Sequence, residues 1–133
     1  MKNFGKIKTT LNAYLPPIIW AGLIFFLSDQ SKLPSTPQPL FDLIFKQTAH
    51  VVVYAILYLL IRRAVFKTQQ IKNKLRAKLI ILLVVFLYAL GDEFHQSFIP
   101  GREATWIDIA FDMLGATLMF FFSPLILDEP ITT

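Results

Sequence analysis

The residues best suited to chemistry lie in one stretch, Gly91 to Ala116, which hydrophobic segments flank on both sides. Ionisable side chains are expensive at membrane depth, so a cluster of them between two apolar segments indicates a functional site. In a medium of low dielectric constant, Arg102 is expected to form bidentate pairs with carboxylates such as Glu93 or Asp108. The charged residues of this stretch are Asp92, Glu93, Arg102, Glu103, Asp108 and Asp112.

The first two acids of the stretch, Asp92 and Glu93, lie within about one helical turn of Gln96, which shares a face with both. Together with His50, these acids have the residue types that general acid–base chemistry requires. No serine of the chain lies in the elbow motif of a Ser-His-Asp nucleophile. General acid–base chemistry is therefore compatible with the spacing but is not singled out by it.

Two further helical faces carry polar residues. Asp108 and Asp112 share one face with Gly115, and the missing side chain of Gly115 lets another helix approach closely. Lys46 and His50, four residues apart, share a face of an earlier segment. A carboxylate as deep as Asp112 is expected to be protonated or paired with Lys46 or His50.

Structural roles are the alternative for several of these residues. Thr105 and Asp108 have the spacing of a capping box, so Asp108 can serve only to cap its helix. An ion pair of Arg102 can simply hold the turn between two helices. His95 lies off the face of the acids and is expected at an interface, and Tyr54 is expected to be an ordinary packing or interface aromatic.

A metal site is a further alternative, because His50, Glu93, Asp108 and Asp112 have the donors of a mixed nitrogen and oxygen shell. The chain has no close-spaced ligand pair such as His-Glu-x-x-His. It also contains no cysteine, so thiolate ligands and disulfides are excluded. The sequence therefore predicts neither a bound metal nor a cofactor.

Long hydrophobic segments must position these side chains. Of the 133 residues, 55% are hydrophobic and only 17% are charged, and the apolar residues occur in blocks rather than in amphipathic stripes. This pattern predicts an all-α integral membrane protein, a single domain over residues 1–133 with four transmembrane helices. We expect these helices at about residues 11–27, 40–62, 77–98 and 105–123, with turns in the proline-rich segment 28–38 and at Pro100-Gly101.

Prolines and charges modify three of these helices. The first segment has the outline of a cleaved signal peptide, but Pro16-Pro17 favours a retained helix, with the prolines near its start. In the third segment only 13 uncharged residues separate Lys78 from Asp92. That is about 21 Å of helix in a hydrocarbon core of about 30 Å, so we expect the acids to enter the outer part of the membrane. Ser123-Pro124 is expected to bend or end the fourth helix.

The charge distribution predicts the orientation. Ten of the 13 lysines and arginines lie in the N-terminal segment and between the second and third helices, so both termini are expected to be cytoplasmic. Seven carboxylates then fall in the outer half of the chain with only three cations, which predicts an acidic, outward-facing polar pocket. The basic residues are expected to contact membrane lipids, and no recognition module supports nucleic-acid binding.

At these residues the chain resembles the VanZ-like family, and the resemblance covers nearly the whole sequence. One departure is Asp112, where the family pattern has asparagine. The resemblance rests on three motifs in order, which are Ser28-x-Gln30, Lys46-x3-His50-x3-Tyr54 and Asp92-Glu93-x2-Gln96-x-Phe98-x-Pro100-Gly101-Arg102-x5-Asp108-x6-Gly115.

The resemblance implies a small bacterial protein that crosses the cell (cytoplasmic) membrane several times. The member that names the family is associated with low-level resistance to the glycopeptide antibiotic teicoplanin. With the motif positions carried over, the predicted functional cluster consists of Gln30, Lys46, His50, Asp92, Glu93, Gln96, Arg102, Asp108 and Asp112.

Three functions fit this cluster, and we favour the first. It is a membrane-embedded binding protein for a cell-envelope molecule, such as a lipid-linked wall precursor or a lipoglycopeptide, with Arg102 and Lys46 on anionic groups. The second is a membrane enzyme acting on a lipid-linked or cell-wall substrate, with Asp92 or Glu93 as general base. The third is a structural membrane subunit whose polar residues only order the helices. Whether the protein is an enzyme, and its oligomeric state, stay open at this point.

Overall fold

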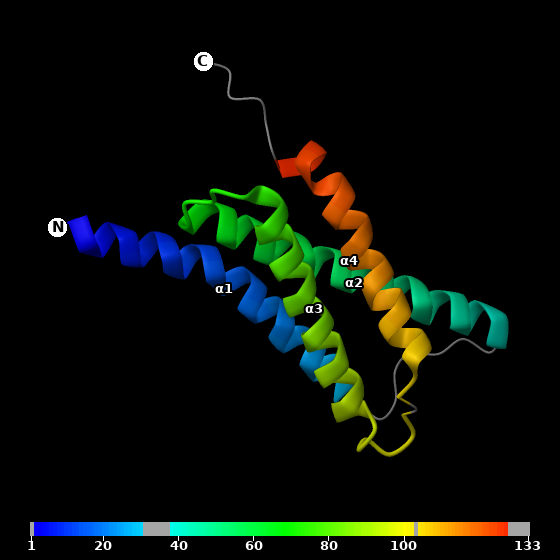
Figure 1. The fold of residues 1–133 in the computed structure, drawn as a ribbon. Helices are drawn as coiled ribbons and strands as arrows, with labels where there is room; N and C mark the ends of the chain where they lie inside the picture. The colour runs from blue at the N-terminus through cyan, green and yellow to red at the C-terminus, as the bar shows by residue number, and fades with distance from the viewer. Residues whose placement is uncertain (1, 31–37, 103, 128–133) are drawn as a thin grey trace.

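The computed structural model describes residues 2–30, 38–102 and 104–127, which form four helices and, within these ranges, no strand (Figure 1). The predicted proline-rich loop lies mostly outside the described residues, as does Glu103. The four helices are α1 (Lys2–Ser28), α2 (Pro39–Thr68), α3 (Lys74–Gln96) and α4 (Trp106–Leu127).

Three helices of the described part are long and apolar enough to cross a membrane, namely Gly5–Ser28 of α1, Pro39–Thr68 and Trp106–Ser123 of α4. The predicted class, an all-α membrane protein, is confirmed at this level. Helix α3 is not among these three, and it has charged residues near both ends, at Lys74, Lys78, Asp92 and Glu93.

Helix α1 differs from its predicted bounds, because it begins at Lys2 rather than near residue 11. Lysine favours helices almost as strongly as leucine, so the polar start needs no apolar face to be helical. Pro16 and Pro17 therefore lie inside the helix and not in its first turn. Each proline removes one backbone donor, which α1 tolerates without ending.

Two other ends also lie beyond their predicted positions. Helix α2 continues past Arg62 to Thr68, because Arg and Lys are good helix formers and favour the negative end of the helix dipole. Helix α4 continues through Pro124 to Leu127, so of the two predicted effects of Ser123-Pro124, a bend or an end, the end does not occur. A single missing N–H near a helix end breaks only one intrahelical hydrogen bond.

Close packing of α4 on α2 depends on Gly115. A Cβ at this position would clash with the backbone carbonyl of Val51 on α2, so a glycine is required there. The predicted role of Gly115 in helix approach is confirmed. Between the helices lies an apolar core that includes Leu57, Ile81 and Val85, each at most 2% exposed.

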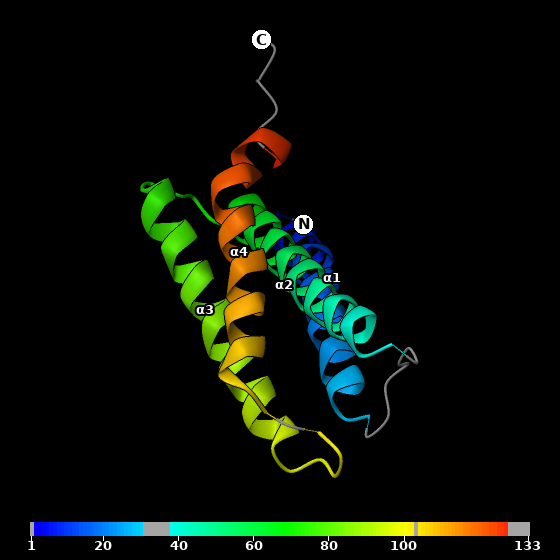
Figure 2. The ribbon, with the colours of Figure 1, turned by 90° about the vertical axis from the view of Figure 1, so that its right-hand side faces the viewer.

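The basic segment 62–78 and the acids at the end of α3 lie toward opposite ends of the bundle. In Figures 1 and 2 the start of α1, the connection between α2 and α3 and the last turns of α4 lie at one end, opposite the connection between α3 and α4. At the first end, the hydroxyl oxygens of Thr68 and Tyr14 lie 3.3 Å apart, and Lys78 Nζ lies 4.3 Å from the centre of the Phe120 ring. The basic segment 62–78 is thus remote from Asp92.

Candidate functional site

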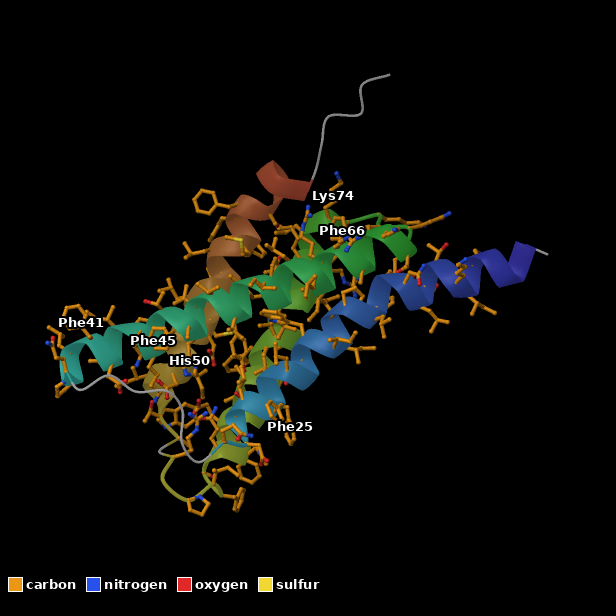
Figure 3. All side chains as sticks on the ribbon, turned by 180° about the vertical axis from the view of Figure 1, so that it is seen from behind. Phe25, Phe41, Phe45, His50, Phe66 and Lys74 are labelled. Atoms are coloured by element: carbon orange, nitrogen blue, oxygen red, sulfur yellow. The ribbon has the colours of Figure 1, made fainter. Side chains whose placement is uncertain are left out.

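Polar side chains of all four helices meet near the end of α3, at the start of α4 and along the first half of α2. Figure 3 marks this region by His50 on α2. The turn that joins α3 to α4 includes Gly101, whose φ of 83° is in the left-handed region that glycine adopts readily. We call this set of side chains the polar cluster; it consists of Ser28, Lys46, Gln47, His50, Tyr54, Asp92, Glu93, Gln96, Thr105, Asp108 and Asp112.

Asp92 connects three helices. Its Oδ2 accepts hydrogen bonds from Ser28 Oγ of α1 at 2.8 Å, from Gln96 Nε2 of α3 at 3.1 Å and from Tyr54 Oη of α2 at 3.4 Å. Gln96 Nε2 also donates to Ser28 Oγ at 3.2 Å, which completes a small network. The sequence predicts that Tyr54 is an ordinary packing or interface aromatic. In the structure it is only 1% exposed and donates to a buried carboxylate, so its role goes beyond packing.

Glu93 reaches across to the start of α4. Its Oε2 accepts a hydrogen bond of 3.0 Å from the backbone N–H of Thr105. Thr105 Oγ1 accepts in turn from the backbone N–H of Asp108 at 3.2 Å, which is the predicted N-cap contact. The second half of the predicted capping box is different, because Glu93 supplies the acceptor for Thr105 in place of the Asp108 side chain.

The Asp108 carboxylate faces α2. Its Oδ2 lies 2.8 Å from Lys46 Nζ, and its Oδ1 accepts a hydrogen bond of 3.2 Å from Gln47 Nε2. Asp108 is fully buried, whereas the side chain of Lys46 is 38% exposed. The Asp108 side chain therefore does not cap α4 but holds the start of α4 against α2 through an ion pair.

His50 and Asp112 form the deepest pair between α2 and α4. His50 Nδ1 lies 2.7 Å from Asp112 Oδ1, and Asp112 is fully buried. Of the alternatives predicted for Asp112, which were protonation or pairing with Lys46 or His50, the structure shows the contact with His50. An imidazole held by a buried carboxylate has a fixed ring orientation, which is the arrangement of many proton-transferring histidines.

Two predicted members are placed differently. Gln30, two residues after the end of α1, donates from Nε2 to the carbonyl of Phe26 in the last turn of that helix at 3.1 Å, and no hydrogen bond from Gln30 to the polar cluster is found in the described part of the chain. The expected ion pair of Arg102 with Glu93 or Asp108 is also absent there, and Arg102 Nε is buried without a hydrogen-bond partner. Asp108 instead contacts Lys46 and Gln47, and Glu93 Oε2 accepts from the backbone N–H of Thr105.

His95 takes part in a separate pair outside the polar cluster. Its Nε2 lies 3.2 Å from Asp29 Oδ1, and its ring stacks on Phe25 with the ring centres 4.5 Å apart. Both members of the pair are partly exposed, at 30% and 54% of their side chains. The position agrees with the expectation that His95 lies off the face of the acids.

Residue types and spacing alone do not indicate Ser28, Gln47 and Thr105 as members of the cluster. Ser28 belongs to the Ser28-x-Gln30 motif, and its sequence context argues only against a role as a nucleophile. Its partner Asp92 is 64 residues away, and helical periodicity carries no information at that separation. Gln47 directly follows Lys46, so the signal available for it was its position next to a predicted site residue.

Three carboxylates of the cluster keep free acceptor capacity. Asp92 Oδ1, Glu93 Oε1 and Asp112 Oδ2 are buried and have no hydrogen-bond partner among the described residues. Buried carboxylate oxygens are normally satisfied, because leaving one without a partner costs free energy. The cluster can therefore accept further hydrogen bonds or a cation.

Comparison with known proteins identifies the fold family of this arrangement. The model of the VanZ/LLP1 family matches residues 13–127, a range that includes every member of the polar cluster. The resemblance inferred from the motifs is thereby confirmed. Neither a search of the curated proteins nor a search of the solved structures finds a match.

Proposed function

Because the chain belongs to the VanZ/LLP1 family, we propose that this membrane protein binds the polar head group of a cell-envelope molecule in its polar cluster. The expected molecule is a lipid-linked cell-wall precursor or a lipoglycopeptide, and binding contributes to resistance to glycopeptides of the teicoplanin type. The observation that carries the proposal is the free acceptor capacity of three buried carboxylates, those of Asp92, Glu93 and Asp112. Head groups rich in hydroxyl and amide N–H donors are the natural partners of such oxygens.

Two cations complete the recognition chemistry. Arg102 Nε is buried and has no hydrogen-bond partner among the described residues, and a guanidinium can make a bidentate contact with a phosphate or carboxylate. Lys46 is 38% exposed although it is paired with Asp108, so it can also reach an anionic group. The head group of the proposed ligand therefore combines an anionic group with hydrogen-bond donors.

Exposed aromatic side chains near the cluster fit a ligand with an acyl chain. Phe94, Phe98 and Trp106 are 69%, 68% and 80% exposed, and they follow or flank the acids of α3 and α4. Aromatic residues prefer the membrane–water interface, where head group and acyl chain of a lipid meet. The ligand can thus contact the polar cluster with its head group and these rings with its tail.

The proposal places the cluster at the outer face of the cytoplasmic membrane. In this arrangement α3 is a fourth span, and both termini and the basic segment 62–78 are cytoplasmic. The support is the separation of charge, because basic residues gather at the end of the bundle away from Asp92 and Glu93. A site at the outer leaflet is where a wall precursor or an external glycopeptide is available.

Antibiotic susceptibility in a Gram-positive host tests the proposal. Wild type, Glu93→Gln and Arg102→Ala are expressed at matched membrane levels, with His95→Gln as the control from the pair outside the cluster. We expect wild type and His95→Gln to raise the inhibitory concentration of teicoplanin, and the cluster variants to lose this effect at equal abundance. Vancomycin, which lacks the acyl chain, is expected to be affected less.

Other outcomes of the susceptibility test would contradict the binding proposal. If wild type gives no protection, or if the cluster variants protect as well as wild type, the binding proposal is wrong. If the cluster variants disappear from the membrane while His95→Gln persists, a structural role of the cluster is favoured.

The His50–Asp112 pair favours a second candidate, an enzyme acting on a lipid-linked or cell-wall substrate. Ligand atoms of His50, Glu93 and Asp112 lie within 4.8 Å of one another, so an oriented imidazole stands next to a carboxylate with a free oxygen. In this candidate Glu93 is the general base. Turnover of a lipid-linked wall precursor by the protein in vesicles, lost in Glu93→Gln, would distinguish an enzyme from a binding protein.

A further inference from the structure

Three side chains from three helices converge within the polar cluster. His50 of α2, Glu93 of α3 and Asp112 of α4 each offer a ligand atom, and these atoms all lie within 4.8 Å of one another. With metal–ligand bonds of about 2.1 Å, two tetrahedral ligands are about 3.4 Å apart, so the wider pairs must close by about 1.4 Å at most. His50 Nδ1 and Asp112 Oδ1, which lie 2.7 Å apart, must separate slightly. Side-chain rotations cover these distances.

A second observation points to the same place independently. Glu93 Oε1 and Asp112 Oδ2 have no hydrogen-bond partner among the described residues, although Glu93 is 4% exposed and Asp112 fully buried. Two buried, unpartnered carboxylate oxygens are unfavourable unless another group satisfies them. One cation between them satisfies both at once.

We propose that His50, Glu93 and Asp112 bind a divalent transition-metal ion of the Zn²⁺ type. The imidazole nitrogen favours such ions over Mg²⁺ and Ca²⁺, which prefer oxygen ligands alone. The two carboxylates match the double charge of the ion, because the neighbouring charges of Lys46 and Asp108 already neutralise each other at 2.8 Å. Binding of the ion displaces the proton that His50 and Asp112 share.

Three protein ligands leave at least one coordination position open. An oxygen atom of a phosphate, a hydroxyl group or water can occupy it, which fits a site that receives a polar head group. Metal binding does not require the proposed head group, because all three metal ligands are side chains of the protein.

Metal binding is tested on protein purified in detergent without a polyhistidine tag. The protein is loaded with Zn²⁺ or Co²⁺, dialysed and analysed for metal content, and Co²⁺ absorption reports the ligand set. We expect one ion per chain for wild type and at least a tenfold loss of affinity for His50→Gln, Glu93→Gln and Asp112→Asn. Glu93→Gln retains an acceptor for the Thr105 N–H, so it removes the charge with the least disturbance of the fold.

The chain provides matched controls. It contains only two histidines, and His95 also faces a carboxylate, Asp29, but has no third ligand among the described residues, so His95→Gln is expected to bind metal like wild type. Asp92→Asn removes a buried carboxylate outside the set and is expected to retain the ion. In NMR spectra, diamagnetic Zn²⁺ should shift the imidazole signals of His50 and leave those of His95 in place.

Two results would overturn the inference. One is wild-type protein that binds no ion above the level of His50→Gln. The other is equal loading of wild type and all three ligand variants, with each variant monodisperse in detergent. Neither result depends on antibiotic susceptibility, so a failed metal site and a failed binding function are distinguishable.

Discussion

The backbone N–H of Thr105 donates a hydrogen bond of 3.0 Å to Glu93 Oε2, so α3 supplies the acceptor for the residue that caps α4. The hydroxyl of the same threonine accepts from the Asp108 N–H at 3.2 Å. A residue of the candidate site thus fixes the geometry of the turn that carries Arg102. Glu93 therefore has a structural contact as well as a place in the candidate site. A substitution that tests its chemistry must keep an acceptor for the Thr105 N–H while it removes the charge.

The Thr105 cap leads to the first prediction. Thr105→Ala removes the hydroxyl that accepts from the Asp108 N–H and is expected to lower the free energy of unfolding by about 1 kcal/mol. Thr105→Ser retains the hydroxyl and the backbone contact to Glu93, so its stability should remain close to that of wild type. Thermal unfolding in detergent measures both, and equal midpoints for the two variants would contradict the cap.

The distances around Asp92 lead to the second prediction. Ser28→Ala removes a hydrogen bond of 2.8 Å to the buried carboxylate, whereas Tyr54→Phe removes one of 3.4 Å, near the limit of a useful contact. We expect Ser28→Ala to lower stability by about 1.5–3 kcal/mol, as for a hydrogen bond to a charged group, and Tyr54→Phe by clearly less. Denaturant unfolding of both variants gives the comparison, and a larger effect for Tyr54→Phe would refute this ranking.

The helix contact at Gly115 leads to the third prediction. A Cβ at Gly115 meets the backbone of Val51, which cannot move aside as a flexible side chain can, so Gly115→Ala is expected to separate α4 from α2 and lower the yield of folded protein. Gly91 is the matched control, because nothing lies within 4 Å of a Cβ placed there. Gly91→Ala should raise helix stability by about 0.5–1 kcal/mol. Size-exclusion profiles and unfolding midpoints of the two variants test the contrast.

The proposed four-span orientation leads to the fourth prediction. The chain has no cysteine, so a single introduced cysteine is its only thiol. Ser97→Cys, just after α3, should react with a membrane-impermeant maleimide on intact cells, and Lys72→Cys, between α2 and α3, only after permeabilisation. Labelling of both cysteines from the same side would show that α3 does not span the membrane. If Lys72→Cys reacts on intact cells and Ser97→Cys only after permeabilisation, the orientation is opposite to the one proposed.

Much of the candidate site was predictable from residue types. His50, Asp92, Glu93, Asp108 and Asp112 were selected because ionisable groups between apolar segments are unfavourable without a role, and the structure brings all five together. The pairing of His50 with Asp112 was one of the predicted alternatives, since a deep carboxylate requires a cation or a proton. Helix ends were predicted less well, because lysine-rich and proline-containing segments remain helical when the adjoining apolar segment is helical.

The sequence by itself determined the membrane class, the helical character and the family, because block hydrophobicity and motif spacing are local properties of the chain. Only the tertiary structure decided which polar and charged side chains pair with one another. Lys46 pairs with Asp108 and not with Asp112, Glu93 binds the Thr105 N–H and not Arg102, and Gln30 turns back to Phe26. The decisive contact between Lys46 and Asp108 spans 62 residues. At such separations helical periodicity does not apply, and the packing of α4 on α2 through Gly115 selects the partners.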